Sequence, residues 1–388
     1  MKTEWAHKKL IDLADYYNGM AFKPSDWVES GTKIIRIEQL NNPLGNYDYY
    51  QGSYPEINAI HNEDLIFSWS ATLKVAIWKW GEGVLNQHLF KVVPFENVDK
   101  YFLYYLLDYN MPKLGESSHG STMKHIKRKE LETYSVKIPT TLSAQRRIAA
   151  ILSSADKVIA ATQKLIAKYK QMKQGMMEDL LKPKEGWKMV KLGECCTVNP
   201  KTDTTKVLDD DIVALVRMED VSNDGFITSF SERTYKSLQK RGLTIFQNED
   251  VIFAKITPCM ENGKGALVRN MKSKICMGST EFHVLRACDN VSIDFIYQLT
   301  ISKRFRQKAE MQMTGSAGQQ RVPTTFLEDY LVSIPFKNGK PDLTEQRRIA
   351  AILSGIDAKI AAEEKVLEKY EKVKKWLMER LLDEKNKI

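Results

Sequence analysis

The sequence lacks the signals of several common classes of protein. Within its 388 residues no apolar run reaches the roughly 20 residues that a membrane span needs, and the first residues, MKTEWAHKKLID, hold no apolar core of a signal peptide. The five cysteines form no CxxC pair and no ligand-like cluster with histidine. We therefore expect a cytoplasmic protein with reduced thiols, no bound metal and no contact with a membrane.

Motifs of catalysis are missing as well. There is no G-x4-GK[ST] loop to hold nucleotide phosphates. There is also no Asn/Asp-Pro-Pro-aromatic motif, with which adenine methyltransferases hold a flipped base, because Asn199-Pro200-Lys201 lacks the second proline and the aromatic residue. The sequence also lacks a carboxylate cluster followed by E-x-K, the pattern that would indicate a metal-dependent nuclease. These absences predict a protein with no cofactor and no catalytic activity of its own.

The overall composition is that of a folded protein with a basic surface. Hydrophobic residues make up 43% and charged residues 28% of the chain, and the length suits two globular domains with connectors. The formal net charge is +9 and the sequence pI is about 9.0. Such an excess of positive charge is typical of proteins that bind polyanions, although many basic proteins bind none.

The chain contains the same nine residues, QRRIAAILS, twice, beginning at Gln145 and at Gln346, which are 201 positions apart. Other segments recur in the same order. They are WAHKKL at Trp5 and WKMVKL at Trp187, IIRIEQL at Ile34 and ALVRMEDV at Ala214, NEDLIFS at Asn62 and NEDVIFA at Asn248, and GSTMKHI at Gly120 and GSAGQQRV at Gly315. A repeat of this extent predicts a duplicated unit, in which a globular domain precedes one long helix.

The globular part of each unit has a mixed pattern. Short runs bounded by Gly, Asn and Pro, such as 33–37, 64–68 and 135–138, favour strands, whereas 101–108 and 291–308 favour helices. The predicted fold class is therefore α+β, with two similar α/β domains.

Each QRRIAAILS copy opens a pattern in which apolar positions recur at alternating steps of four and three residues, as in a coiled coil. Both patterns are interrupted twice, near the middle and near the end. Ser143 and Thr344 are expected to cap the two helices. The positions are Ile148, Leu152, Ala155, Ile159, Thr162, Ile166, Tyr169, Lys173, Met176 and Leu180 in the first copy, and Ile349, Leu353, Ile356, Ile360, Glu363, Leu367, Tyr370, Lys374, Leu377 and Leu381 in the second.

A helix of about forty residues is roughly 60 Å long and needs a packing partner to be stable in water. A globular domain separates the two helices in the sequence, so the chain can return along the first helix with the second. We therefore expect an intramolecular antiparallel coiled coil. The alternative is that each helix packs on its own domain or on another chain.

These features resemble the specificity (S) subunit of Type I restriction-modification systems over essentially the whole chain. The resemblance rests on a W-x4-L segment at the start of each domain and on an "IP…(E/A)QRRIAAIL" segment at its end, at Ile138-Pro139 and at Ile334-Pro335. Ala144 departs from the glutamate that the family often has there and that this chain has as Glu345.

The resemblance implies that two target recognition domains each read one half of a bipartite, asymmetric site in double-stranded DNA. The helices would set the spacer length and dock two methyltransferase (M) subunits, and restriction (R) subunits would complete the complex. The expected boundaries are 1–141 for the first recognition domain, 142–183 for the first helix, 184–342 for the second domain and 343–388 for the second helix.

Base edges are read mainly by Arg, Lys, Asn, Gln, Ser and Thr, and phosphates collect Lys and Arg. Loop-like segments with that content are the candidates for DNA binding, although each also suits a solvated turn. The predicted DNA-binding residues are Lys74, Lys79, Asn86, Gln87, His88, Ser118, His119, Gly120, Ser121, Lys124, His125 and Lys127 in the first domain, and Lys255, Thr257, Asn262, Lys264, Gly315, Ser316, Gln319, Gln320 and Arg321 in the second.

Two further groups have open roles. Trp69, Trp78 and Trp80 suit either base stacking or core packing. The helix starts suit contact with DNA phosphates, with the neighbouring domain or with an M subunit, and comprise Gln145, Arg146, Arg147, Gln346, Arg347 and Arg348.

A coiled-coil scaffold that organises proteins and ignores DNA is the alternative function. The dependence of binding on salt separates the two, because a DNA reader loses affinity steeply as salt rises and a scaffold retains no DNA at all.

Overall fold

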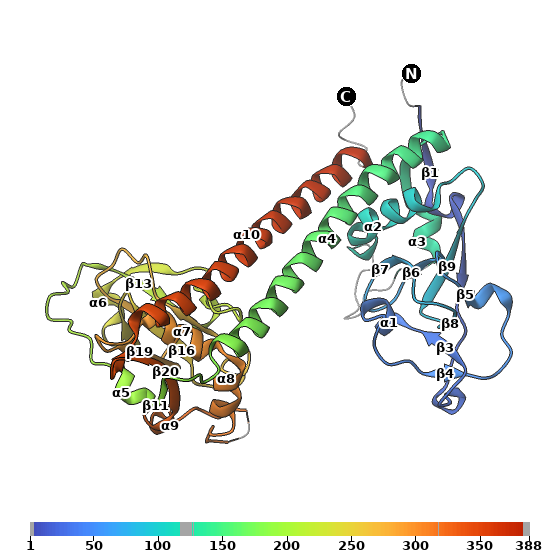
Figure 1. Cartoon of the computed structure of the whole chain (residues 1–388). Coiled ribbons are helices and arrows are strands. Elements are labelled where there is room, and N and C mark those ends of the chain that lie inside the picture. The colour runs from blue at the N-terminus through green and yellow to red at the C-terminus, as the bar shows by residue number, and fades with distance from the viewer. Residues whose placement is uncertain (1–3, 117–125, 127, 317, 383–388) are drawn as a thin grey trace. The chain divides into compact units, whose positions relative to one another are not determined.

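The computed structural model describes residues 4–116, 126, 128–316 and 318–382. The chain divides into two compact units, one formed by residues 1–163 with 365–388 and the other by residues 164–364. Each unit holds one globular domain together with part of each of the two long helices, α4 (Leu142–Leu180) and α10 (Leu343–Leu382) (Figure 1).

The domain of the first unit is built on two four-stranded sheets and a strand pair. One sheet has the order β2-β9-β6-β7, the other has the order β4-β3-β8-β5, and β1 pairs with β10. The strands are β1 (Trp5–Lys9), β2 (Ala14–Asn18), β3 (Thr32–Ile35), β4 (Tyr49–Tyr50), β5 (Ala59–Ile60), β6 (Leu65–Ser68), β7 (Lys74–Ile77), β8 (Gly83–Leu85), β9 (Leu89–Pro94) and β10 (Ser135–Pro139), and the helices are α1 (Ile37–Asn41), α2 (Lys100–Glu116) and α3 (Arg128–Thr133).

The domain of the second unit repeats this plan. Its sheets have the orders β12-β19-β16-β17 and β14-β13-β18-β15, and β11 pairs with β20, to which β21 is added. The strands are β11 (Trp187–Lys191), β12 (Cys196–Val198), β13 (Ile212–Val216), β14 (Ser231–Thr234), β15 (Thr244–Phe246), β16 (Asp250–Ala254), β17 (Gly265–Leu267), β18 (Cys276–Gly278), β19 (Phe282–Ala287), β20 (Leu331–Lys337) and β21 (Lys340–Pro341), and the helices are α5 (Leu192–Cys195), α6 (Tyr235–Leu238), α7 (Ile293–Ile301), α8 (Lys303–Glu310) and α9 (Thr324–Asp329).

The duplication seen in the sequence is therefore a duplication of topology. Each strand from β1 to β10 has its counterpart ten numbers later, in the same order within the sheet. The match extends to strand direction, since β3 pairs with β8 in parallel and β13 pairs with β18 in parallel, while the other pairs in these sheets are antiparallel. The predicted fold class, with two similar α/β domains, is confirmed.

Two local predictions were wrong. The segment 291–308 is not one helix, because Ser302 has an extended backbone and its Oγ accepts a hydrogen bond from the Phe305 N–H at 3.3 Å, which starts α8 afresh. The long helices are capped by residues just before those expected. Thr141 Oγ1 accepts from the Ala144 N–H at 3.4 Å, and Asp342 Oδ1 accepts from the Thr344 and Glu345 N–H groups at 3.0 and 3.1 Å.

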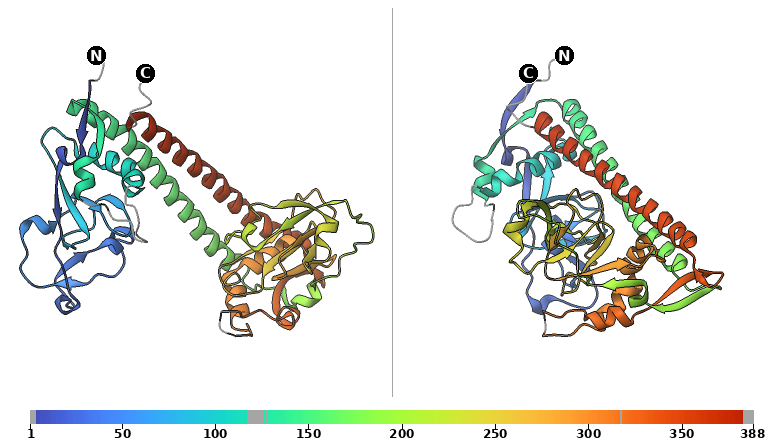
Figure 2. Two further views of the ribbon diagram at one scale, coloured as in Figure 1. Left: turned by 180° about the vertical axis from the view of Figure 1, so that it is seen from behind. Right: turned by 90° about the vertical axis from the view of Figure 1, so that its left-hand side faces the viewer.

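The two long helices lie side by side (Figures 1 and 2), and each unit shows what holds them. In the second unit, Ile349 and Leu353 of α10 are fully buried in one cluster with Met177 of α4 and Phe295 of α7. In the first unit, Ile148 and Leu152 of α4 lie in the domain core, against which Leu377 of α10 also packs. Each helix thus packs both on the other helix and on a domain, so the two arrangements considered for the helices coexist.

Ion pairs between the helices explain the second interruption of the apolar pattern. In the second unit, Lys173 Nζ of α4 lies 2.5 Å from Asp357 Oδ1 of α10, and both side chains are at most 10% exposed. In the first unit, Lys374 Nζ of α10 lies 2.7 Å from Asp156 Oδ1 of α4. Lys173 and Lys374 are equivalent in the repeat, as are Asp156 and Asp357. The lysines are therefore seam residues with a partner across the helix pair.

The direction of pairing follows from the second unit alone. Lys170 of α4 pairs with Glu364 of α10 at 3.0 Å, and Lys173 pairs with Asp357. The residue number rises along α4 while that of its partner falls along α10. The helices are antiparallel, as predicted.

We predict that Asp357→Ala lowers the free energy of unfolding by about 3–5 kcal/mol, because it leaves the buried Lys173 ammonium without its counter-ion. The equivalent Asp156→Ala should cost less, about 1–3 kcal/mol, because its pair with Lys374 is more exposed, at 21% and 34%, and the main loss is the acceptor of the Tyr105 hydroxyl at 2.6 Å. Urea unfolding of the two variants and of the wild type measures both losses. Equal losses would contradict the assignment of a buried pair to the second unit.

Candidate nucleic-acid interface

The predicted segments of the second domain meet at the end of β16 and the start of β19. The Lys255 N–H donates to the Glu281 carbonyl at 2.9 Å, and the Val322 N–H donates to the Lys255 carbonyl at 2.9 Å. The Thr257 N–H donates to the Gln320 carbonyl at 3.0 Å. The segments 255–264 and 314–321, which are far apart in the sequence, therefore form one continuous backbone surface.

The segment 314–321 is a hairpin closed by two backbone hydrogen bonds. The Thr314 N–H donates to the Arg321 carbonyl at 3.0 Å, and the Arg321 N–H donates to the Thr314 carbonyl at 2.8 Å. Gly315 has φ +129°, and a Cβ there would lie 2.8 Å from the Gln319 carbonyl oxygen, so the turn requires glycine. The exposed tip carries polar side chains suited to hydrogen bonding, those of Ser316, Gln319 and Gln320.

Arg321 forms a two-point ion pair at the base of this hairpin. Its Nε and Nη2 atoms donate to the two carboxylate oxygens of Glu281, at 3.0 and 2.8 Å, and its Nη1 donates to the Gln319 carbonyl at 3.1 Å. The Arg321 guanidinium holds the pKa of the Glu281 carboxyl below its usual value. Glu281 was missed by sequence reasoning, because an isolated glutamate carries no signal until the fold places it beside an arginine.

The other predicted residues of the second domain differ in exposure and in whether their side chains bond within the domain. Asn262 is exposed, and Lys255 is half-buried. The Lys264 amine donates to the Met218 carbonyl at 2.8 Å, and Thr257 Oγ1 donates to the Gln320 carbonyl at 3.3 Å. Lys264 and Thr257 thus already have partners within the domain.

The first domain has the same backbone junction with different side chains. The Trp69 N–H donates to the His88 carbonyl at 3.4 Å, and the Ile126 N–H donates to the Trp69 carbonyl at 2.8 Å. Trp69 and His88 therefore occupy the places of Lys255 and Glu281, and their rings lie 5.6 Å apart. An aromatic pair in one domain replaces a cation and an anion in the other.

The other residues predicted for the first domain differ in exposure and in hydrogen-bond partners. Lys79 is exposed, whereas the Lys74 amine donates to the Leu40 carbonyl at 2.6 Å. Asn86 is buried and accepts from the His88 N–H at 3.3 Å, and the Gln87 amide nitrogen lies 3.3 Å from His88 Nε2. Seven predicted residues lie outside the described residues: Ser118, His119, Gly120, Ser121, Lys124, His125 and Lys127.

The tryptophans divide between the two roles considered for them. Trp78 is fully buried in a core cluster, and its indole nitrogen donates to the Gly81 carbonyl at 2.7 Å. Trp80 packs edge-on against it, with ring centroids 5.1 Å apart. Core packing therefore accounts for Trp78 and Trp80. Trp69 is half-buried and also packs on the core of its domain, beside His88 at the candidate surface.

The glutamines at the start of the long helices anchor the domains. Gln145 Oε1 accepts from the Asp99 N–H at 2.8 Å, next to the start of α2, and Gln346 Oε1 accepts from the Ser292 N–H at 2.8 Å, next to the start of α7. Both glutamines are at most 1% exposed. The first residue of each QRR segment is thus a buried glutamine. It joins α4 to the start of α2 in the first domain and α10 to the start of α7 in the second.

The arginines that follow are exposed. Arg146 Nε lies 3.5 Å from an oxygen of Asp99, and Arg348 forms a two-point pair with Glu345 of its own helix. Arg147 and Arg347 point to solvent.

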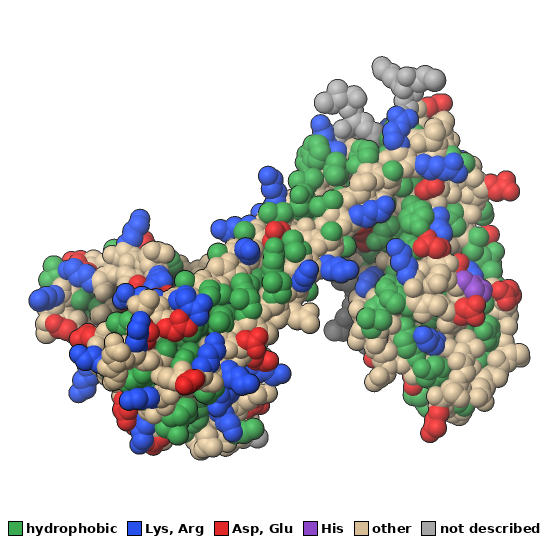
Figure 3. Space-filling view, viewed as in Figure 1, with side chains coloured by type: hydrophobic (Ala, Val, Ile, Leu, Met, Phe, Trp, Pro, Cys, Tyr) green, Lys and Arg blue, Asp and Glu red, His purple; other side chains and the backbone are tan. Residues whose placement is uncertain are grey.

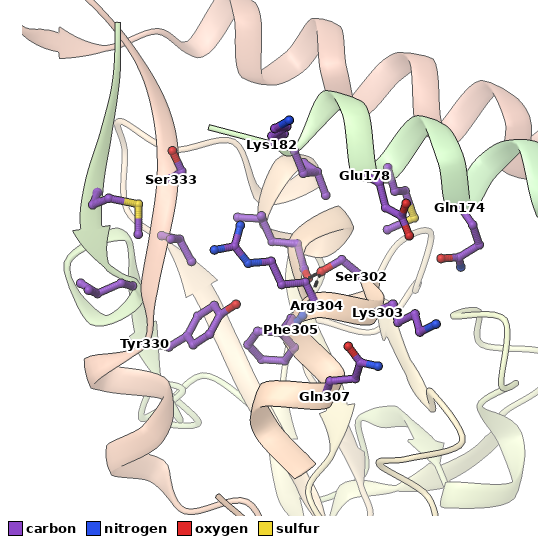
Figure 4. A pocket seen from close by; sticks show the side chains of 16 residues that line it. Gln174, Glu178, Lys182, Ser302, Lys303, Arg304, Phe305, Gln307, Tyr330 and Ser333 are labelled. Carbon is purple, nitrogen blue, oxygen red and sulfur yellow. Dashed lines mark hydrogen bonds between the residues drawn. The ribbon is translucent and has the colours of Figure 1, made fainter. Parts of the chain in front are cut away.

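A cavity of about 350 Å³ lies in the second unit between the end of α4, α8 and β20 (Figure 4). Its walls combine apolar side chains, among them Met177 and Phe305, with the charged side chains of Lys182, Arg304 and Glu178. None of the predicted site residues lines it. Among the described residues no cluster of His, Cys, Asp and Glu fits a metal ion, and no helix is both long and apolar enough to cross a membrane.

Comparison with known proteins places this duplicated architecture in a family. The family model described as "Type I restriction modification DNA specificity domain" matches the chain twice, over residues 2–171 and 184–372. The chain belongs to this family. The two matches cover both units of the repeat, and the predicted family is therefore confirmed.

Curated relatives of this specificity-domain family match part or all of the chain. The EcoEI specificity subunit of Escherichia coli is 36% identical over 177 residues, and the EcoAI specificity subunit of the same organism is 38% identical over 168 residues. These matches cover 44% and 42% of this chain but only 27% of each relative. The MjaVIII specificity subunit of Methanocaldococcus jannaschii is 23% identical over 99% of this chain and 93% of its own length.

Solved structures share the fold of this specificity-domain chain. The S subunit of a Type I restriction-modification system from M. genitalium has a TM-score of 0.59 at 12% identity and covers 99% of this chain and 97% of its own. A chain from a structural study of complex assembly and conformational transition in the type I R-M system has a TM-score of 0.56 at 13% identity and covers 98% of both chains.

We predict that Gln346→Ala lowers the free energy of unfolding by about 1–3 kcal/mol, because it leaves the buried Ser292 N–H without an acceptor. Arg347→Ala, at the exposed neighbouring position, is the control and should change stability by about 0.5 kcal/mol or less. The midpoints of urea unfolding report both effects. Similar losses in the two variants would show that the glutamine is not an anchor.

Proposed function

We propose that this chain is the non-catalytic DNA-specificity subunit of a Type I restriction-modification complex. Each globular domain reads one half of a bipartite, asymmetric DNA site, and partner subunits supply methylation and cleavage. The observation that carries the proposal is the duplicated topology with unlike side chains at the equivalent surface junction. Membership of the specificity-domain family supports it, and nothing in that family assignment favours a scaffold that ignores DNA.

The asymmetry of the site follows from the side chains. Equivalent backbone positions would meet equivalent places on the two half-sites, so differences in reading must come from the side chains at those positions. Trp69 and His88 in the first domain answer to Lys255 and Glu281 in the second. An aromatic pair offers stacking and apolar contact, whereas the charged groups offer directed hydrogen bonds. Two different half-sites are the expected result.

The residues that would touch DNA remain those predicted from the sequence, with the exposed ones foremost. In the second domain these are Asn262, Ser316, Gln319 and Gln320, with the half-buried Arg321 beside them, and in the first domain Lys79. The recognition domains are assigned to residues 1–141 and 184–342. The coiled-coil segments are assigned to residues 142–183 and 343–388, within which α4 occupies 142–180 and α10 occupies 343–382.

The long helices would also dock the M subunits. Besides the seam that faces its partner helix, α4 carries Ile151, Val158 and Met172 at heptad spacing, each 40–45% exposed. α10 carries exposed Val373 and Trp376. Hydrophobic side chains also lie on the face of the helices that Figure 3 shows. Exposed apolar side chains in such a row suit the packing of a further helix. We assign this face to two M subunits in the cytoplasm, with R subunits joining the full complex.

The proposal is tested by producing the chain with its M subunits and mapping methylated positions in DNA. The expected result is a single bipartite motif, which disappears when the chain is left out. Methylation without a bipartite motif, or a motif that persists without the chain, would contradict the proposed function.

We predict that inserting one heptad into both α4 and α10, at facing positions, lengthens the spacer of the motif by about three base pairs, because seven helical residues add roughly 10 Å. The same heptad inserted into α10 alone is the control and should abolish methylation, since it puts the helix pair out of register. Methylome sequencing reads the spacer directly. An unchanged spacer in the double insertion would mean that the M subunits set it.

A further inference from the structure

We propose that Arg321, held in place by Glu281, reads a guanine in the half-site of the second domain. This inference rests on the proposed function and adds to it the base that one residue recognises. Glu281 is a positioning residue, and Arg321 is the residue that touches the base.

The Arg321 guanidinium has more N–H donors than its partners within the domain use. A guanidinium has five N–H groups, and Arg321 uses three of them within the described part of the chain, two toward Glu281 and one toward Gln319. Because Glu281 takes the side formed by Nε and Nη2, one hydrogen is left on each of Nη1 and Nη2. We assign the Nη1 hydrogen on the Cδ side to the Gln319 carbonyl. The two end-on hydrogens that remain are then the neighbouring donors that a bidentate contact to guanine O6 and N7 requires.

The charge of the Arg321–Glu281 pair favours a base edge over a phosphate. The Glu281 carboxylate largely neutralises the guanidinium, so the pair attracts a phosphate weakly and its carboxylate repels one. Guanine O6 and N7 are neutral acceptors and are not repelled in this way. The ion pair therefore favours a base edge over the DNA backbone, in contrast to an unpaired surface lysine such as Lys79 of the first domain.

Arg321 is held rigidly at its backbone and at its side chain. Backbone bridges join Arg321 to Ile256 on one side and to Thr314 on the other. The next carbonyl, that of Val322, lies 2.8 Å from Nε2 of the buried His283. A side chain fixed at its backbone and at its guanidinium loses little freedom when it binds, so its selectivity for one base is high.

A second arginine shows what a purely structural pair looks like. Arg269 also donates through Nε and Nη2 to a glutamate, Glu249, at 3.1 and 3.0 Å, beside the opposite end of β16. Its Nη2 donates in addition to Asp294 at 2.9 Å, which occupies the second Nη2 hydrogen. Arg269 therefore has no end-on pair of donors left for a base and is a matched control.

The repeat indicates that the first domain reads a different base at this place. The Ile126 N–H donates to the Trp69 carbonyl as the Val322 N–H donates to the Lys255 carbonyl. Aligning Ile126 with Val322 sets His125 at the position of Arg321 in the sequence, and His88 takes that of Glu281. Imidazole cannot make the two-donor contact of a guanidinium. A guanine at this position is therefore expected in only one half-site.

The test compares methylomes of cells that carry the M subunits with the wild-type chain, Arg321→Lys, Glu281→Gln or Arg269→Lys. Arg321→Lys should lower the preference for one guanine in one half-site by about 5- to 150-fold. Glu281→Gln should relax the same position less, because the amide still accepts one hydrogen bond from the guanidinium. Arg269→Lys should leave the motif unchanged.

A second measurement does not depend on how the variants fold. The wild-type complex is assayed for methylation of synthetic sites. In each site one guanine of the half-site is replaced by 7-deazaguanine, which lacks the N7 acceptor. One replacement should slow methylation by the wild-type complex in the range given above, and no effect of any replacement would contradict the guanine assignment.

The outcomes separate the two proposals. If the wild-type complex yields no bipartite motif, the proposed function itself fails. If the motif is bipartite but Arg321→Lys leaves it unchanged, or lowers methylation equally at all sequences as a phosphate contact would, the guanine assignment is overturned while the proposed function stands.

Discussion

The ion pairs between α4 and α10 are the constraint on which the rest of the structure depends. Because the two helices are copies of one sequence, a parallel, in-register pairing would set Lys173 against Lys374 and Asp156 against Asp357. The antiparallel pairing sets each lysine against an aspartate instead. Repulsion in one arrangement and attraction in the other select the direction of the chain. Charged groups inside an apolar seam add little net stability, but they specify its register.

The two long helices make equivalent contacts with the domains that precede them in the sequence. Gln145 and Gln346 hold the first helix of their domains by the same hydrogen bond. The two domains then share backbone, sheet order and strand direction, so what distinguishes them lies in the side chains on that common frame. The junction of Trp69 with His88, and of Lys255 with Glu281, is one place where the difference is chemical rather than one of shape.

The duplication, the α+β class and the antiparallel helices could be predicted from the sequence, because repeats and heptads are periodic and need no knowledge of distant contacts. The partner of Lys173 could not be predicted, because the whole second domain separates it from Asp357 in the sequence. Nothing in the sequence around Asp357 distinguishes it from a solvent-exposed aspartate. The break at Ser302 was missed for a related reason: a serine in an apolar helical pattern ends a helix only where the fold turns. Loop composition singled out Arg321 as a candidate but not its partner Glu281. It also did not indicate that the Lys74 and Lys264 amines donate to carbonyl groups of their own domains.

Zero-length carbodiimide cross-linking of the unmodified protein, followed by mass spectrometry of the monomer band, tests the helix pairing most directly. It joins a lysine amine to a carboxylate only when the two are in contact. The account predicts linked peptides that join Lys374 to Asp156 and Lys170 to Glu364. Lys170 also lies 3.1 Å from Asp224, so a link between these two is compatible with the helix pairing. Absence of both helix–helix links from the monomer, with Lys374 joined to carboxylates outside α4 or the links found only between two chains, would contradict it.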